Sequence, residues 1–289
     1  QNVRDNYMLG SMKWRVIMKR MGLILLVFLV IVGSLVGCNL ISEGIDRGKE
    51  NDLSQYQVFE ADVISNKNGL LVTPDEDSLE RSSSDKIYVG LVGAKVYDQD
   101  GNLVDEDMYD KDGNLVYDDV FKSGDRVKIT YDGIILESYP AQISAKKVEI
   151  IGHNHIVDGI FAVIDDIYQE DGALNSGITM IAIDTSEWTS LTKAEIYTIL
   201  AMAKENYEVE IVQGTFEELA EQGLIDEDNL YFEKGILIKL NDIKINKGRD
   251  KINCSIQKWR SGLGAIGWDA EAKLKTGEWK TTRDNMWIS

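Results

Sequence analysis

The chain contains few of the residues on which many secreted domains and enzymes depend. Its 289 residues include two cysteines and two histidines, and 31 basic residues stand against 49 acidic ones, for a formal net charge of −18. Two cysteines exclude a framework of several disulfides. An acidic surface repels nucleic acid, because nucleic-acid binding depends on basic side chains that contact phosphates. We therefore expect a protein that does not bind nucleic acid and whose charge serves solubility, with attraction of cations or basic partners as the alternative.

Recognisable catalytic motifs are also lacking. The sequence has no Gly-x-Ser-x-Gly, no His-Glu-x-x-His, no P-loop and no Cys/His pair at a known spacing. Cys254 lies in an alternating strand pattern, far from both histidines, so we expect a buried and unreactive thiol. We expect neither enzymatic activity nor a cofactor. A carboxylate-dependent hydrolase stays open as an alternative, because its paired acids need not be close in sequence.

A leader precedes the globular part of the chain. Basic residues stand before an apolar run, 21–36, which is shorter than the roughly 20 residues that span a bilayer. The run ends in Leu35, Val36, Gly37 and Cys38, which resembles the lipobox of bacterial lipoproteins. The resemblance implies that residues 1–37 are removed and that Cys38 receives a lipid. The protein would then be anchored in the cell membrane and face its extracytoplasmic side.

The chain after the leader divides into a tether and two domains. Residues 38–55 are polar and aperiodic and predict a tether. The pattern from 56 to 151 is strand-like, and the pattern from 156 to 289 mixes helices and strands. Residues 1–11 contain a methionine only at position 8, and we expect translation to start at Met12 or Met18.

The first domain predicts a small all-β barrel. Short strands alternate with turn signals, and helical periodicity is lacking, which suits a five-stranded barrel of the oligonucleotide/oligosaccharide-binding (OB) type. Two of its segments read KSGDRV (122–127) and YDGIILESYPAQI (131–143). They resemble the signature of an uncharacterised domain family of secreted Gram-positive lipoproteins, over about residues 57–151. The resemblance implies a compartment but no activity. We expect Pro140 to end a strand at a structural corner.

An acidic repeat lies inside this domain. Residues 97–104 recur as 109–116, and each copy contains an Asp-Gly pair that predicts a hairpin turn. If Gly101 or Gly113 took the sixth position of an EF-hand loop, its first position would lack an acid. We expect a solvated double hairpin over 97–119, with calcium binding as the alternative.

Both histidines lie where the two domains meet. His153 and His155 would point the same way on a strand, an arrangement that suits zinc or copper. Further ligands are not evident at a recognised spacing. We therefore expect a linker with exposed imidazoles and keep a metal site as the weaker alternative.

The second domain predicts an α+β fold. Its pattern favours helices at 156–167, 190–206 and 215–222, and strands at 179–184, 209–212, 236–240, 251–259, 270–274 and 279–288. We expect helices packed on a curved antiparallel sheet, as in cystatins or nuclear transport factor 2. This is an analogy of fold and implies no activity.

A glycine- and tryptophan-rich segment stands near the C-terminal end. Gly262-x-Gly264-x-x-Gly267 has the letters of a dinucleotide fingerprint, but a strand pattern follows it, so we expect a bend between two strands. The segment 259–289 resembles the end of other uncharacterised Gram-positive lipoproteins. Trp259 and Trp268 are expected mainly in the core. The alternative is an aromatic interaction surface beside Arg260.

These features predict a non-catalytic binding or protein-interaction module at the cell envelope. Its partners would be the membrane, through the lipid anchor, and an envelope protein, peptide or glycan. A carboxylate-dependent envelope hydrolase is one alternative. A ligand-sensing accessory of a transporter or signalling system is another.

Overall fold

A computed structural model describes residues 56–67, 69–104 and 120–289. The lipobox, Cys38 and the whole of the predicted tether lie outside the described residues, as does most of the acidic segment 97–119. Within the described ranges, no helix is both long enough and apolar enough to cross a membrane.

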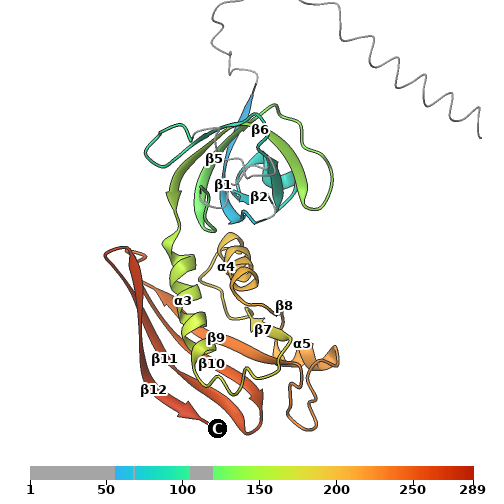
Figure 1. Ribbon diagram of the computed structural model, residues 1–289, viewed down its shortest axis with the longest axis vertical. Coiled ribbons are helices and arrows are strands. Elements are labelled where there is room, and N and C mark those ends of the chain that lie inside the picture. Colours follow the sequence, from blue (N-terminus) through green and yellow to red (C-terminus); the bar gives the residue numbers. More distant parts are fainter. Residues whose placement is uncertain (1–55, 68, 105–119) are drawn as a thin grey trace, which may run out of the picture. The chain divides into compact units, whose positions relative to one another are not determined.

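Five strands close the predicted barrel (Figure 1). They are β1 (Gln57–Ser65), β2 (Leu70–Pro74), β3 (Ile87–Gly90), β5 (Asp125–Tyr131) and β6 (Ala141–His153). Strand β1 is antiparallel to β2 and β5, β2 is antiparallel to β3, and β5 is antiparallel to β6. The parallel pair β3–β6 completes the ring, which is the strand order of an OB-type barrel. The predicted fold class of this domain is confirmed.

The barrel interior is filled by alternate residues of its strands. Along β1, Phe59, Ala61 and Val63 are buried, because successive strand residues point to opposite faces. Phe121, which precedes β5, is fully buried in the same core. The sequence suggested that Pro140 ends a strand. In the structure Pro140 instead stands directly before β6.

A short strand and a short helix are added to the five barrel strands. Strand β4 (Lys95–Tyr97) pairs in parallel with β6. The helix α2 (Leu79–Ser83) was not predicted, since a single turn has no visible periodicity. It is held by Ser78, whose hydroxyl accepts a hydrogen bond from the Arg81 N–H at 3.2 Å. After β4, the Asp98 carboxylate accepts backbone N–H groups of the Asp-Gly turn, so the first predicted hairpin turn is present.

The second region contains three helices, near the predicted positions. They are α3 (His155–Gln169), α4 (Lys193–Asn206) and α5 (Phe216–Glu221). Helix α4 begins with a capping box of Thr192 and Glu195, and α5 begins with one of Thr215 and Glu218. Threonine and glutamate three residues apart thus fix both helix starts.

A six-stranded sheet accompanies these helices. Its strands are β7 (Met180–Asp184), β8 (Glu210–Gln213), β9 (Gly235–Ile245), β10 (Lys251–Ser261), β11 (Gly264–Lys275) and β12 (Glu278–Ile288), in the order β12-β11-β10-β9-β7-β8. The α+β class is confirmed. The sheet is mixed, however, and not wholly antiparallel as expected, because β7 is parallel to both β8 and β9. The chain passes from β7 through α4 to β8, and such a helical crossover returns it in the same direction.

Helix α3 packs closely on the sheet (Figure 1). Its buried residues Ile156, Ile160, Val163, Ile164 and Ile167 form one face, as the sequence predicted. At Gly159 the approach is tightest, since a Cβ there would lie 2.6 Å from the Ile252 side chain and 2.7 Å from the Trp279 ring. Glycine therefore permits the contact between α3 and strands β10 and β12.

The barrel and the α+β region have separate apolar cores, joined by polar contacts. The Tyr197 hydroxyl of α4 donates to Asp85 at 2.7 Å. Asn154, between β6 and α3, donates from Nδ2 to Glu195 at 2.9 Å. At the predicted boundary, residues 152–155, strand β6 ends at His153 and helix α3 begins at His155.

Candidate functional site

The strand-to-helix corner brings both histidines together. His153 is the last residue of β6 and His155 the first of α3, and their ring centroids lie 4.8 Å apart. Asn154 fixes the corner, because its side chain accepts the Ile156 N–H at 3.2 Å and its own N–H donates to Gly124 at 2.8 Å. The two histidines were expected on one strand, but they lie on either side of the corner between β6 and α3. His153 was expected to be exposed in a linker, but its side chain is mostly buried.

Two carboxylates flank the His153 ring. Its Nδ1 lies 2.7 Å from Asp125 Oδ1, and its Nε2 lies 2.8 Å from Asp158 Oδ2. Asp125 is itself buried and accepts the Lys122 N–H at 2.7 Å. Hydrogen bonds that His153 donates to Asp125 and Asp158 raise its pKa to about 9. His153 is therefore an imidazolium at neutral pH when the corner holds no other cation.

The corner also offers ligand atoms for a metal ion. One donor atom each of His153, His155 and Asp158 lie within 4.8 Å of one another. A cavity of about 580 Å³ lies beside them, lined also by Lys122, Ser123, Glu205 and Asn206. Sequence reasoning found the two histidines but missed Asp125. A signal for it existed, because Asp125 belongs to the KSGDRV segment that carries the family resemblance.

A groove on the outside of the barrel is a second candidate. It has a volume of about 510 Å³ and is lined by residues of β3 and β6, by the segment that connects β5 to β6, and by Gly69. In that segment Ile134 and Leu136 are 62% and 57% exposed. Leu136 is held against β6, since its N–H donates to Gln142 at 2.8 Å and its carbonyl accepts from Gln142 at 3.2 Å.

A smaller pocket extends the groove toward helix α4. It has a volume of about 330 Å³ and shares Gly69 and Tyr88 with the groove. Lys67 and Lys204 line its far part, whereas Asp132 lines the first groove. We name the two together the barrel groove. The barrel groove is thus lined by Asp132 in its first part and by Lys67, Lys204 and Glu205 in the smaller pocket.

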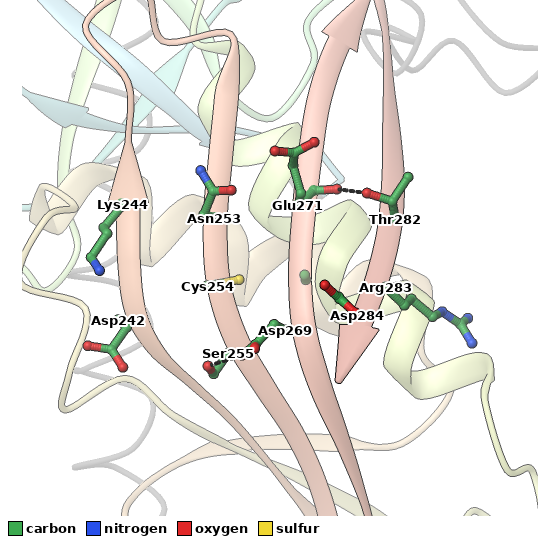
Figure 2. A pocket seen from close by; sticks show the side chains of 11 residues that line it. Asp242, Lys244, Asn253, Cys254, Ser255, Asp269, Glu271, Thr282, Arg283 and Asp284 are labelled. Atoms are coloured by element: carbon green, nitrogen blue, oxygen red, sulfur yellow. Dashed lines mark hydrogen bonds between the residues drawn. The ribbon is translucent and has the colours of Figure 1, made fainter. Parts of the chain in front are cut away.

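The open face of the second sheet carries a third, polar hollow of about 550 Å³ (Figure 2). Rows of directly opposed residues build it, because Asn253 pairs with Lys244 and Glu271, and Ser255 pairs with Asp269. Figure 2 shows Arg283 pointing away from the other labelled side chains. That residue is on the helix side, where it lies 4.4 Å from the Trp268 ring centroid and pairs with Asp166.

The pKa values of two carboxylates of this polar hollow, Asp269 and Glu271, are lowered by their neighbours. Hydrogen bonds from Asn285 and Ser255 lower the pKa of Asp269. Lys251 and Lys273 lower the pKa of Glu271 to about 2. A hydrolase that uses two carboxylates needs one with a raised pKa to donate a proton. Neither Asp269 nor Glu271 meets that requirement.

Arg260, expected as an interaction residue, contacts three backbone carbonyls. Its guanidinium donates to Leu174 at 2.8 Å, to Ser176 at 2.8 Å and to Glu233 at 3.2 Å. Two residues earlier, the buried Lys258 donates to the carbonyl of Tyr168 at 3.1 Å and to that of Glu170. Burial lowers the pKa of Lys258 to about 8. Both cations thus hold the end of α3 and the loop after it onto β10.

The two candidate tryptophans have different environments. Trp268 is 1% exposed and belongs to the main core, beneath Arg283. Trp259 is half-buried and packs edge-on against Phe216 of α5, with ring centroids 5.2 Å apart. The structure therefore does not bring Trp268, Trp259 and Arg260 together into one open aromatic surface.

Two further predictions from the sequence are confirmed. Cys254 is buried, and burial raises the pKa of its thiol to about 12. The glycine-rich segment is the turn of the β10–β11 hairpin, in which Ser261 pairs with Gly264. Gly264 and Gly267 themselves belong to strand β11, so the dinucleotide fingerprint lacks its helix.

Comparison with known proteins concerns the barrel alone. Neither curated proteins nor solved structures gave a match to the chain. Residues 63–152, which include both segments that carry the resemblance noted above, match the model of a family described as "Protein of unknown function (DUF3221)". The chain therefore contains a DUF3221 domain at residues 63–152, and no role is known for that domain.

Proposed function

We propose that the protein is a lipid-anchored, non-catalytic binding protein on the extracytoplasmic side of the cell membrane, and that it holds an extended peptide segment in the barrel groove. The observation that carries the binding proposal is the exposure of Ile134 and Leu136 on a segment fixed by backbone hydrogen bonds. The anchor would be Cys38, after the residues Leu35-Val36-Gly37.

The groove combines features that suit a peptide. Neighbouring exposed aliphatic side chains indicate an interaction surface, because burying them is favourable. Gln142 and Ser144 add polar groups beside them, which can pair with a peptide backbone. Ser138 further fixes the segment, since its hydroxyl donates to the Pro140 carbonyl at 2.7 Å. A rigid surface binds with a smaller loss of conformational entropy than a mobile one.

The place of the groove in the fold also supports this proposal. OB-type barrels bind extended ligands on the face of their second and third strands, between the loops that follow strands one and four. Here those loops are 66–69 and 132–140, and Gly69, Ile134 and Leu136 from them line the groove. This is an analogy of fold, so the peptide itself is argued from the aliphatic side chains.

Selection from a displayed library of random peptides tests the proposal. The wild type should enrich a common motif that contains apolar residues, whereas Leu136→Asp and Ile134→Asp should enrich none. Val92→Asp is the matched control, because Val92 is 92% exposed on the same barrel and does not line the groove. Thermal melts establish that each variant is folded. Equal enrichment by the wild type and the two groove variants would refute the groove as the binding site.

A further inference from the structure

We propose that His153, His155 and Asp158 form a three-ligand site for a first-row divalent cation, with Zn²⁺ as the expected ion and Asp125 as the residue that orients His153. Imidazole nitrogens and a carboxylate oxygen are typical zinc ligands. None of these four residues lines the barrel groove, and only Glu205 lines both that groove and the cavity beside the site, so the proposal does not rest on peptide binding.

The distances between the ligand atoms fit such a site. Two ligands 2.0–2.1 Å from a tetrahedral zinc ion are about 3.3 Å apart. Asp158 Oδ2 lies 2.8 Å from His153 Nε2 and 3.6 Å from His155 Nδ1. Shifts of a few tenths of an ångström at these two contacts, together with a closer approach of the two histidine nitrogens from the 4.8 Å span of the cluster, would therefore seat the ion. His155 and Asp158 are both partly exposed, and rotation of their side chains can supply these shifts.

The buried Asp125 gives His153 the orientation that a metal ligand needs. With Nδ1–H donating to Asp125 at 2.7 Å, the lone pair of the neutral ring lies on Nε2, toward Asp158. Metal-bound histidines are generally held in this way, by a carboxylate on the other ring nitrogen. The second oxygen of Asp125 accepts the Lys122 N–H at 2.7 Å, so this carboxylate is itself fixed.

The second histidine adds a further imidazole nitrogen beside the same carboxylate. Asp125 and Asp158 already flank His153 on both ring nitrogens. His155 Nδ1 lies 3.6 Å from the same Asp158 oxygen, which is beyond hydrogen-bond distance. Two imidazole nitrogens beside one carboxylate oxygen are together three ligand atoms of the kind that binds a divalent metal ion.

The surroundings leave room for the remaining ligand. The cavity of about 580 Å³ beside the cluster is lined by three carboxylates, Asp125, Asp158 and Glu205, against a single lysine, Lys122. A water molecule entering from this cavity would complete a four-coordinate ion. The acidic net charge of −18 also raises the concentration of cations near the surface.

The position of the site suggests its effect on the protein. His153 and Asp125 belong to the barrel strands β6 and β5, whereas His155 and Asp158 belong to α3. A bound ion would therefore fasten the barrel to the first helix of the second region. Because the ion binds the folded state, zinc should raise the melting temperature of the protein.

Calorimetric titration of the full chain, purified without a histidine tag, tests the site with zinc alone. The wild type should bind one ion saturably, and His155→Gln and Asp158→Asn should each bind at least tenfold more weakly. Asp125→Asn should weaken binding roughly 10- to 100-fold, as expected for a carboxylate that orients a ligand. Asp228→Asn, an exposed acid outside the cavity, is the control and should bind like the wild type.

Three outcomes would overturn the proposal. The first is zinc binding by the wild type that is no tighter than binding by His155→Gln and Asp158→Asn. The second is loss of binding in Asp228→Asn, which would indicate general attraction to acids. The third is an equal rise in melting temperature with magnesium at the same concentration, because magnesium prefers oxygen ligands and octahedral geometry. His155 is half exposed, so His155→Gln tests the site even if Asp125→Asn fails to fold.

Discussion

The Arg260 guanidinium donates to the Leu174 carbonyl at 2.8 Å. Leu174 lies in the loop after α3, five residues beyond Gln169, the last residue of the helix. The same guanidinium also holds Ser176 of this loop and Glu233, so it ties the loop to strand β10. Arg260 therefore has a structural reason to be next to the glycine-rich turn. This reason was invisible in the sequence, because the loop and the strand are far apart along the chain.

Arg260→Ala should lower the free energy of unfolding by about 1–3 kcal/mol, because three carbonyl groups lose a charged donor. Urea denaturation measures this loss. Arg260→Lys should recover part of it, since lysine keeps the charge but not the forked geometry. A variant of unchanged stability that lost binding to a partner would instead support the interaction role expected from the sequence.

Trp268→Ala should lower the free energy of unfolding by about 3–5 kcal/mol, because it leaves a large cavity beneath Arg283. Trp287→Ala is the matched control. That ring lies on the next strand and is 43% exposed, so its removal should cost clearly less. Equal losses in both variants, measured by urea denaturation, would contradict the assignment of Trp268 to the core.

Periodic patterns predicted most of the fold. The apolar spacing from Ile156 to Ile167 located α3, and the pair Thr215 and Glu218 located the start of α5. Both signals are local, so they can be read without knowing the tertiary structure. The parallel direction of β7 depends on where the chain returns after α4, and the six-strand order does not follow from local patterns.

The candidate sites were harder to predict, because their residues are brought together by tertiary structure. His153 was noticed as a ligand, but Asp125 is 28 residues away and reaches it only through the β5–β6 pair. In the sequence, Leu136 belongs to a short apolar run that does not distinguish an exposed residue from a buried strand residue. Its exposure depends on the bridge to Gln142, which turns the segment back along β6.

Cys38→Ala should abolish lipidation and leave an unprocessed precursor, because the thioether requires a thiol at that position. Metabolic labelling with a fatty-acid analogue in a bacterial host measures the modification. Cys254→Ala is the control, and it should be labelled like the wild type because that thiol is buried. Equal labelling of Cys38→Ala and the wild type would refute the lipobox assignment.

Residues 56–151 and 156–289 should each fold when produced separately, because each region has its own apolar core. Each fragment is expected to melt cooperatively, at a lower temperature than the intact chain. The melting temperature falls because each fragment lacks the contacts between the two regions, such as the hydrogen bond of Tyr197 with Asp85. If neither fragment melts cooperatively, the two regions depend on one another and the boundary must be withdrawn.

The pH dependence of stability should report on His153 in protein kept free of metal with a chelator. The folded state raises the pKa of His153 to about 9 from its ordinary value of 6.5, through hydrogen bonds to Asp125 and Asp158. The folded state therefore binds this proton more tightly than the unfolded state does. The resulting stabilisation, on the order of 2–3 kcal/mol, is fully present below pH 6.5 and is lost as the pH rises toward 9.

Urea denaturation between pH 6 and pH 10 measures this loss by comparing His153→Gln with the wild type. The variant should be less stable than the wild type at pH 6, and the difference should shrink as the pH approaches 9 and above, because only the wild type gives up its proton there. His155→Gln is the matched control, since it keeps His153 and both of its carboxylates, and it should follow the wild-type profile. A constant difference between His153→Gln and the wild type across this range would contradict the prediction. In that case the contribution of His153 would come from packing and neutral hydrogen bonds, and not from a charged imidazolium between two carboxylates.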